Sequence, residues 1–420
     1  MAKENVVVEK VNKKNGVEML LRRALTEYSS SLETFHSYER NLMNSIEITV
    51  AALENSKEEK ENPTIDKLIE FNKLAKRIDK YHASRTILPK SNVLTLIMIY
   101  DNFFVSLLKQ VFKIRREMLT RLRAGVSADE IVGCDNKEQI ENLIIEKNLE
   151  TLMYKSHSDQ IMWLEESFGI TLDKKILNDF LFVTALRNVV AHNNGKVNEI
   201  FRKNIRGYGI KIKEKLEFSD LYCPCRIRKY TRAMIHFSIH LYTVLSKKIF
   251  KNDVENIDDF VNNICFEFLQ DKNAQMAIDI LEPIIKDKKK SANSEMLFMF
   301  SINLAIGYKL AKKENKMSDV LSSLDWSNCD DKFRFARAVL TEDNKKIYDF
   351  MEKFSDEKWK VYYKEWPLFY FIRESTEFRE KYKEMYSEEY VIAQQKYCKC
   401  DILKKVAERN KCGDDKVEDC

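Results

Sequence analysis

The sequence predicts an all-α fold, and three observations support that prediction. Glycine and proline, which interrupt helices, occur only 9 and 5 times in 420 residues. Apolar residues recur along most of the chain at the three- and four-residue spacing of one helix face. Hydrophobic residues make up 44% of the chain, which is ample for sizeable cores and argues against disorder. We therefore expect one to three helical domains.

The N-terminal part of the chain, residues 1–89, is expected to form helices that pack on the following bundle. Residues 16–56 carry a long amphipathic pattern, which a charged break ending at Pro63 interrupts. A second helix is expected over residues 64–84. It should end near Pro89, because proline lacks the backbone N–H that continues a helix.

Residues 90–251 are expected to form a helical bundle. Ser91 is a typical N-cap for the strongly apolar helix that follows. Asp101 is an isolated charged residue in the apolar surface of that helix. Residues 137–167 supply a further helix, and residues 226–250 form one that begins basic and ends apolar.

A polar connector is expected in the middle of this bundle. Residues 207–212 favour either a short strand or an extended loop. The basic residues of the connector are Arg202, Lys203 and Arg206.

In the C-terminal region, residues 252–400, the expected helices become short and follow one another in pairs. It resembles a tetratricopeptide-like or related α-solenoid, although no strict period of about 34 residues survives. We expect this region to sense a signal or bind a partner, because it carries no candidate chemistry. Residues 401–420 are expected to be a polar tail. The expected helices are 255–270, 273–285, 293–312, 316–324, 330–340, 343–354, 357–373 and 375–386.

The helix expected over residues 173–192 is the most informative part of the chain. Its apolar residues surround almost the whole helix, which indicates burial. Thr171 or Asp173 caps its beginning, and Asn193-Asn194-Gly195 is a terminator at its end. A polar side chain in its last turn must therefore face water, a ligand or a partner.

Towards its end this helix carries four polar residues: Thr184, Arg187, Asn188 and His192. At about 100° per residue they share one face spanning roughly 140°. A cation can hold a phosphate, an amide can orient a neighbouring group, and a histidine titrates near neutral pH and can move protons. These are the groups that metal-free cleavage of RNA requires.

Arg187, four intervening residues and His192, with Asn188 directly after the arginine, resemble the R-x4-6-H signature of HEPN-domain ribonucleases. The resemblance spans roughly residues 90–250. It implies a four- or five-helix bundle, and a homodimer in which two motif helices meet at an RNA-cutting cleft. It also implies that His192 is the base or proton relay at the ribose 2′-hydroxyl, that Arg187 holds the scissile phosphate, and that Asn188 orients one of them.

Many HEPN proteins are toxins or infection-triggered effectors in bacterial anti-phage systems, so the resemblance implies a role in abortive infection. The implied partners are RNA, a second copy of the chain, and an antitoxin or a phage-derived trigger. No carboxylate cluster accompanies the motif in sequence, so we expect no metal and no cofactor, with the RNA's own 2′-hydroxyl as nucleophile. Loops or single strands, such as a tRNA anticodon, are the expected targets because duplex RNA is stiff.

Further residues are candidates for supporting the motif. Asp101 is a candidate partner of Arg187 or His192 across the bundle, with an exposed aspartate as the alternative, and Asn193 is another candidate partner. Two basic clusters are candidates for binding an RNA backbone, with a solvated surface as the alternative. The first consists of Lys113, Arg115, Arg116, Arg121 and Arg123. The second consists of Arg226, Arg228, Lys229 and Arg232, with Tyr208, Tyr222 and Tyr230 near in sequence.

Other matches to functional patterns are weaker. A second R-x4-H match, Arg77 to His82, has isoleucine after the arginine and lies in a charged segment, so we interpret it as surface. His236 and His240 have a metal-binding spacing, but their apolar neighbours favour packing. Two cysteine pairs have a single intervening residue, which is poor geometry for zinc. They are Cys223 with Cys225 and Cys398 with Cys400.

Composition narrows the remaining function classes. No P-loop, dinucleotide-binding glycine signature, HExxH or G-x-S-x-G pattern is present. A net charge of +5 does not by itself demand nucleic acid. Nine cysteines without a secretory pattern argue against a disulfide framework, and no apolar run of about 18 residues occurs, so we expect a soluble, cytoplasmic protein. The alternative to a nuclease is a non-catalytic adaptor that binds RNA or protein.

Overall fold

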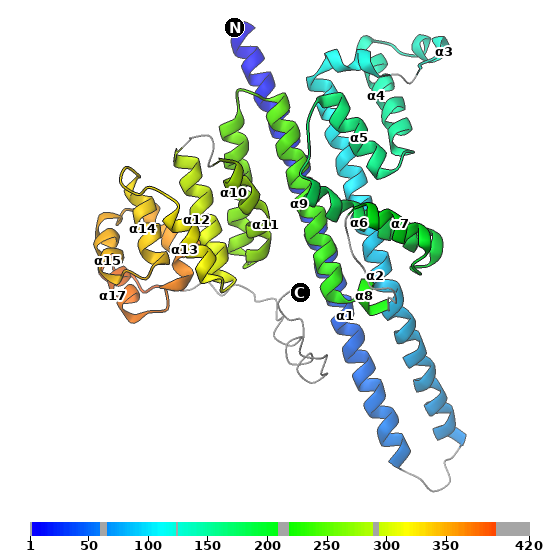
Figure 1. Cartoon of the computed structure of the whole chain (residues 1–420). Helices are drawn as coiled ribbons and strands as arrows, with labels where there is room; N and C mark the ends of the chain where they lie inside the picture. Colours follow the sequence, from blue (N-terminus) through cyan, green and yellow to red (C-terminus); the bar gives the residue numbers. More distant parts are fainter. Residues whose placement is uncertain (1, 59–64, 123–124, 209–217, 289–293, 392–420) are drawn as a thin grey trace. The chain divides into compact units, whose positions relative to one another are not determined.

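The computed structural model describes residues 2–58, 65–122, 125–208, 218–288 and 294–391 (Figure 1). Helices joined by short connections make up this part of the chain, which contains no β-strand. The all-α prediction is therefore confirmed for the described residues. The chain divides into two compact units between Ile249 and Phe250.

Unit 1 is a helical bundle in which α6 packs against α2, α5, α7 and α9. The first helix, α1, packs along α2 and α9, so the N-terminal helices belong to this unit. The elements of unit 1 are α1 (Ala2–Glu58), α2 (Ile65–Ile114), the 3-10 helix η1 (Arg116–Arg121), α3 (Ala128–Val132), α4 (Lys137–Met153), α5 (His157–Phe168), α6 (Lys174–Asn193), α7 (Glu199–Gly207), α8 (Phe218–Tyr222) and α9 (Pro224–Ile249).

Three buried aromatic rings hold the centre of this bundle. Phe180 of α6 stacks on Phe237 of α9, with their ring centroids 3.9 Å apart. The ring of Tyr100 on α2 lies 4.6 Å from that of Phe180 and 5.7 Å from that of Phe237. Buried aromatic pairs of this kind stabilise a core beyond the area that they bury. They fix the position of α6 along both neighbouring helices.

The helices α1 and α2 form a long antiparallel pair, and their far ends extend beyond the other helices of unit 1 (Figure 1). The prediction that a helix ends near Pro89 is wrong, because α2 continues through this proline. Burial explains the difference. Pro89 and Asn92 are buried, and the Asn92 amide donates a hydrogen bond of 3.0 Å to Ser31 Oγ on α1. Such tertiary contacts offset the hydrogen bond that a proline removes from a helix interior.

The single helix expected over residues 137–167 is two helices, α4 and α5. Ser156 separates them and caps α5, its side chain accepting a hydrogen bond of 3.2 Å from the backbone N–H of Asp159. A serine followed three residues later by an acidic residue is a helix start signal, which the continuous apolar pattern obscured.

The connector after the motif helix contains a helix, α7, that was not predicted. Asn198 caps it, and Phe201 and Ile205 are buried one turn apart. Its charged residues hid this short apolar face. The segment 209–217, which includes most of the expected strand or loop, lies outside the described residues.

Unit 2 consists of helices that pair in sequence, close to the predicted positions. Its central helix α12 packs against α10, α11, α13 and α14. Residues 392–420, which include the expected polar tail, lie outside the described residues. The elements of unit 2 are α10 (Val254–Gln270), α11 (Ala274–Lys288), α12 (Ser294–Leu310), α13 (Glu314–Ser322), α14 (Asp331–Leu340), α15 (Asn344–Lys353), α16 (Glu357–Glu365), the 3-10 helix η2 (Pro367–Phe371) and α17 (Thr376–Tyr386).

The same turn joins three helix pairs of unit 2. Lys272, Lys312 and Glu342 occupy its centre with φ values of 57°, 58° and 59°. In each turn the following residue donates its backbone N–H to a carbonyl five residues earlier, at 2.8, 2.8 and 3.0 Å. The repeated geometry makes α10–α11, α12–α13 and α14–α15 similar hairpins.

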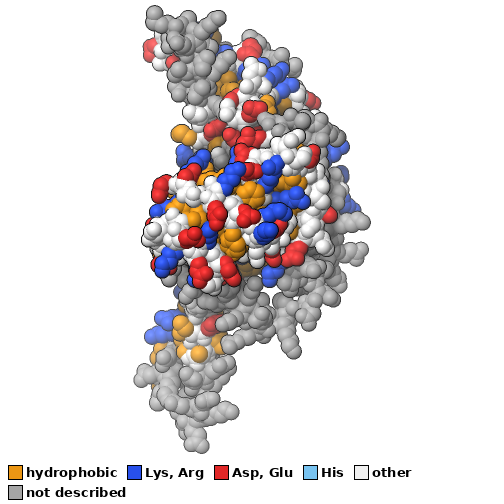
Figure 2. Space-filling model, turned by 90° about the vertical axis from the view of Figure 1, so that its left-hand side faces the viewer, with side chains coloured by type: hydrophobic (Ala, Val, Ile, Leu, Met, Phe, Trp, Pro, Cys, Tyr) orange, Lys and Arg blue, Asp and Glu red, His pale blue; other side chains and the backbone are white. Residues whose placement is uncertain are grey.

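On the face of the molecule that Figure 2 shows, acidic and basic side chains are interspersed and form no patch of one sign.

Candidate functional site

The helix α6, which carries the motif, has a well-defined beginning and end. Of the two expected N-caps, Asp173 is the one observed, since its carboxylate accepts hydrogen bonds from the N–H groups of Lys175 and Ile176 at 2.8 and 3.0 Å. At the other end, Asn194 adopts a left-handed conformation with φ 49°. The N–H of Gly195 then bonds to the carbonyl of Val189 at 3.0 Å. This geometry stops the helix just after the motif histidine.

The three motif residues lie in the last two turns of this buried helix. Arg187 is half-buried, whereas Asn188 and His192 are exposed. Arg187 Nη1 donates a hydrogen bond of 3.0 Å to Asn188 Oδ1. Among the described residues, no carboxylate forms an ion pair with Arg187 or His192.

One member of the predicted polar face does not belong to it. Thr184 is buried, and its hydroxyl donates a hydrogen bond of 2.9 Å to the carbonyl of Leu181. A threonine satisfies its hydroxyl in this way when it lies inside a helix. The accessible polar face therefore begins at Arg187.

A lysine that the sequence analysis missed holds the end of the motif helix. Lys90 Nζ donates a hydrogen bond of 3.0 Å to Asn194 Oδ1. The hydroxyl of Tyr222 donates to the carbonyl of Gly195 at 3.2 Å. The side chain of Asn193, a predicted partner of the motif, donates instead to the carbonyl of Lys196 and so stabilises the turn. No local signal could have revealed Lys90, since 104 residues separate it from Asn194.

Asp101, the other predicted partner, lies against a different histidine. Its Oδ1 is 3.0 Å from His157 Nε2 on α5, and both side chains are half-buried. The ring of His157 also lies 6.0 Å from both Tyr100 and Phe180. Burial raises the pKa of Tyr100 well above its usual value, and the nearby Asp101 carboxylate adds to the rise.

The position of this pair separates it from the motif. Phe180 precedes Arg187 by seven residues, which corresponds to about 10 Å along α6. Asp101 contacts His157 at the level of Phe180. The structure thus joins Asp101 to the core of the bundle rather than to the motif end of α6.

The second basic cluster is largely exposed. Arg226, Arg228 and Lys229 are exposed and Arg232 is half-buried, all on the first three turns of α9. Arg228, Lys229 and Arg232 share one face of the helix by their spacing. This helix begins directly after Tyr222, whose hydroxyl contacts the end of α6.

The first basic cluster is partly neutralised by carboxylates. Arg115 pairs with Glu117, and Arg116 lies 3.5 Å from Glu141. The side chain of Arg121 and the whole of Arg123 lie outside the described residues. Surface cations that pair with carboxylates are typical of solvated faces. The first cluster is therefore a weaker candidate for binding RNA than the second.

The two histidines of α9 support the start of α6. His240 Nε2 accepts a hydrogen bond of 2.9 Å from the backbone N–H of Asp173. Loss of contact with water lowers the pKa of His236 from its ordinary 6.5 to about 4, and His240 and Lys175 add to this fall while Asp173 opposes it. These contacts agree with the predicted packing role.

The remaining sequence candidates lie apart. Arg77 and His82 are both exposed on the far part of α2. Neither Cys223 nor Cys225 forms a disulfide, and the other cysteine pair, Cys398 and Cys400, lies outside the described residues. Within the part of the chain that the structure describes, no group of three or more His, Cys, Asp or Glu side chains is placed to hold a metal ion.

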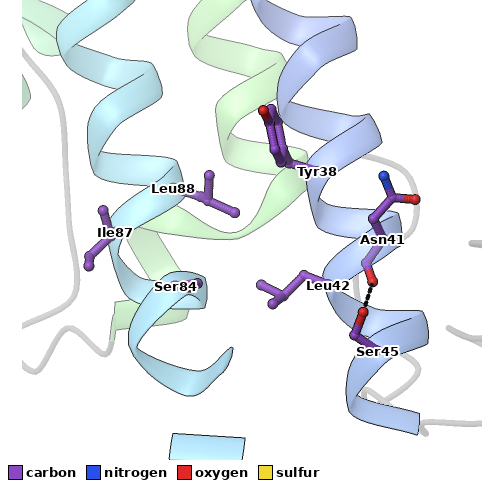
Figure 3. Close-up of a pocket in the computed structure, with 7 residues that line it drawn as sticks. All are labelled: Tyr38, Asn41, Leu42, Ser45, Ser84, Ile87 and Leu88. Atoms are coloured by element: carbon purple, nitrogen blue, oxygen red, sulfur yellow. Dashed lines mark hydrogen bonds between the residues drawn. The ribbon is translucent and has the colours of Figure 1, made fainter. Parts of the chain in front are cut away.

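A groove of about 400 Å³ lies between α1 and α2, and none of the motif residues lines it (Figure 3). Its lining offers amides and hydroxyls among aliphatic side chains but no carboxylate, histidine or basic residue. It therefore brings no acid–base pair together. The lining residues are Tyr38, Asn41, Leu42, Ser45, Ser84, Ile87 and Leu88.

One stretch of the described residues, Asn72–Ile114 in α2, is long and apolar enough to cross a membrane by length and composition alone. Of its most apolar window, 56% is buried inside the fold. The helix α2 packs against α1, α6 and α9.

Comparisons of this chain with protein-family models, with curated proteins and with solved structures found no match. The candidate site therefore rests on the motif and on its geometry.

Proposed function

We propose that this protein is a metal-independent endoribonuclease of HEPN type, acting as a toxin or abortive-infection effector in anti-phage defence. One observation carries the proposal. Arg187, Asn188 and His192 lie in the last two turns of an otherwise buried helix, where Arg187 is bonded to Asn188 and no described carboxylate pairs with Arg187 or His192. Maintaining a cation and an imidazole in this arrangement is typical of a site that receives an anionic substrate.

The contacts suggest a role for each residue. His192 takes the proton from the ribose 2′-hydroxyl, and the 2′-oxygen attacks the adjacent phosphorus as the bond to the 5′-oxygen breaks. The 5′-oxygen takes a proton from the protonated His192 or from water and leaves as a hydroxyl. Arg187 balances the charge on the phosphate, and the Asn188 side chain holds its guanidinium in place through their hydrogen bond. The products are a 2′,3′-cyclic phosphate and a 5′-hydroxyl end.

A second copy of the chain completes the proposed cleft. Ile87, Leu94 and Met98 are 57%, 39% and 57% exposed, and their spacing places them on one face of α2. Lys90, which contacts the end of α6, lies about 60° from this row around the helix. A two-fold interface on this face would bring two motif helices towards one phosphate. Light scattering of the wild-type chain and of Leu94→Glu tests it, since the charge should give a monomer.

The substrate proposed is single-stranded or loop RNA, such as a tRNA anticodon. The exposed cations of α9 begin where Tyr222 contacts the end of α6, so they continue a basic path from the motif. Single strands are also flexible enough to bring the 2′-oxygen in line with the phosphorus. An antitoxin or phage-derived trigger, and a cytoplasmic location, complete this proposal, with unit 2 as the sensing or partner-binding part.

Purified protein tests this function directly. The wild-type chain should cleave single-stranded RNA in excess EDTA, and should leave the same sequence intact when its 2′-hydroxyls are replaced by hydrogen. The His192→Ala chain should cleave neither. Equal cleavage by wild-type and His192→Ala protein would refute the assignment.

The second candidate is a non-catalytic adaptor. The repeated helix hairpins of unit 2 favour it, because stacked helix pairs present extended binding surfaces. An adaptor of this kind would bind RNA or a protein partner and would show no cleavage in the assay above.

A further inference from the structure

A cation is held in a fixed position just beyond the motif histidine. Lys90 Nζ donates to Asn194 Oδ1 at 3.0 Å, two residues after His192. The same ammonium lies 5.6 Å from the centre of the Phe218 ring. A lysine near a helix C-terminus stabilises the helix dipole, but that role does not require an aromatic neighbour.

The backbone at this point is shaped to admit the lysine. Gly195 has a φ of 79°, which side-chain-bearing residues rarely adopt. A Cβ atom at this residue would lie 2.9 Å from Lys90 Cε and 3.0 Å from the Tyr222 hydroxyl oxygen. The glycine therefore allows both side chains to approach the end of α6 closely.

An exposed aromatic ring stands next to this cation. Phe218 is 39% exposed, although it stacks on Tyr222 with ring centroids 4.7 Å apart and an interplanar angle of 28°. Tyr222 is buried, and its hydroxyl is bonded to Gly195. The Phe218 ring is thus supported by Tyr222, has the Lys90 ammonium over it, and remains partly exposed to solvent.

The motif and this cluster lie along one line of α6. Arg187, Ala191 and Asn194 follow at intervals of four and three residues, which places them above one another on the helix. Seven residues correspond to about 10 Å along the axis. Along this line the small, exposed Ala191 comes between Arg187 and Asn194, the residue that Lys90 contacts.

We propose that Lys90 and Phe218 form a nucleotide subsite next to the cleavage motif. Lys90 holds a backbone phosphate that neighbours the one at Arg187, and Phe218 stacks on an unpaired base of single-stranded RNA. This inference rests on the proposed nuclease function. Its chemistry is that of single-strand binding in general, which combines cations along the backbone with aromatic platforms for the bases. The subsite tolerates any base, because every base has a stacking face.

The test measures binding separately from cleavage. A short single-stranded RNA with 2′-O-methyl groups cannot be cut through its 2′-oxygens, so its affinity for the full chain can be measured by fluorescence anisotropy. Phe218→Ala should weaken binding about 5- to 150-fold, the range for loss of one stacked base. Phe218→Trp should retain it. Tyr154→Ala removes an exposed aromatic side chain elsewhere in unit 1 and is the matched control.

Two further variants test the cations. Lys90→Met should weaken binding and should reduce the salt dependence of the affinity by about one unit of slope. Ala191→Glu places a carboxylate between the two cations on an exposed position, and should weaken binding without a change in the thermal melt.

The outcomes separate the subsite from the nuclease. If the wild-type chain cleaves RNA while Phe218→Ala and Ala191→Glu bind the probe as tightly as wild type, the subsite is wrong and the nuclease remains. If Phe218→Ala and Ala191→Glu lose binding but the wild-type chain cuts no RNA, the subsite is supported and the nuclease fails. If the folded wild-type chain neither binds the probe nor cuts RNA, both are wrong.

Discussion

Unit 1 contains two histidines in contrasting surroundings, His157 and His192. His157 is half-buried, lies 3.0 Å from Asp101 and packs against two aromatic rings of the core. His192 is exposed at the end of α6, and forms no hydrogen bond with another described residue. The first arrangement uses the imidazole to join helices, whereas the second leaves it exposed to solvent. The same side chain therefore supports the fold at one place and lies on the surface at the other.

The largest effect, on the rate of RNA cleavage, is expected when the side chain of His192 is removed. His192→Ala should lower RNA cleavage by about 10²–10⁴-fold, because the proton transfer loses its base. The free energy of unfolding should change by about 0.5 kcal/mol or less, since the side chain is exposed. Cleavage rates and thermal melts of the same preparation check both values. A large fall in stability would show that His192 is structural and would remove the contrast.

The opposite result is expected for the histidine of the core. His157→Ala should destabilise unit 1 by about 1–2 kcal/mol, because Asp101 loses its hydrogen-bond partner. Cleavage per folded molecule should remain within about twofold of wild type, because His157 is distant from the motif and its replacement leaves the motif residues unchanged. Urea unfolding and active-site-normalised rates measure the two effects. A strong loss of cleavage at full stability would instead link the Asp101–His157 pair to the reaction.

A third histidine gives a test by pH. His236 has a folded pKa of about 4 against an ordinary value of 6.5, chiefly because it is removed from water. The unfolded chain therefore binds more protons between pH 6.5 and 4, and stability should fall as the pH decreases through that window. One proton corresponds to a slope of at most about 1.4 kcal/mol per pH unit. His236→Phe should make this slope shallower, and an unchanged slope would assign it to other groups.

The smallest effect is expected in unit 2, which contains none of the six histidines. Lys312 lies at the centre of a repeated turn with φ 58°. Lys312→Gly should stabilise this hairpin by up to about 1 kcal/mol, because glycine adopts positive φ without steric cost. The melting temperature should rise slightly and cleavage should not change. A fall in stability would mean that the unfolded-state entropy of glycine outweighs the relief of strain.

Features that depend on residues close together in the sequence could be predicted. The helical hairpins of unit 2 and the cap of α6 at Asp173 follow from spacing and capping patterns. The continuity of α2 through Pro89 did not, because packing against α1 outweighs a local helix-breaking signal. The same is true of the site. The polar end of α6 could be predicted, but its contact with Lys90 depends on how distant helices pack.

The assignment of Asp101 illustrates the same limit. An aspartate in an apolar helix predicts a polar partner inside the bundle, but the sequence offers several histidines and arginines as that partner. Only the register of α2 against α5 and α6 selects His157. Local patterns identify which side chains need partners, and the tertiary structure decides between them.

Attack by a ribose 2′-hydroxyl that His192 activates leaves characteristic ends on the RNA fragments. The chemistry of those ends is therefore the most direct test of the proposed function. A defined single-stranded RNA is incubated with the wild-type chain in EDTA, and the ends of both fragments are determined. We expect a 2′,3′-cyclic phosphate on one fragment and a 5′-hydroxyl on the other, with neither formed by His192→Ala protein. Fragments with 5′-phosphate ends that appear only when magnesium is added would contradict it.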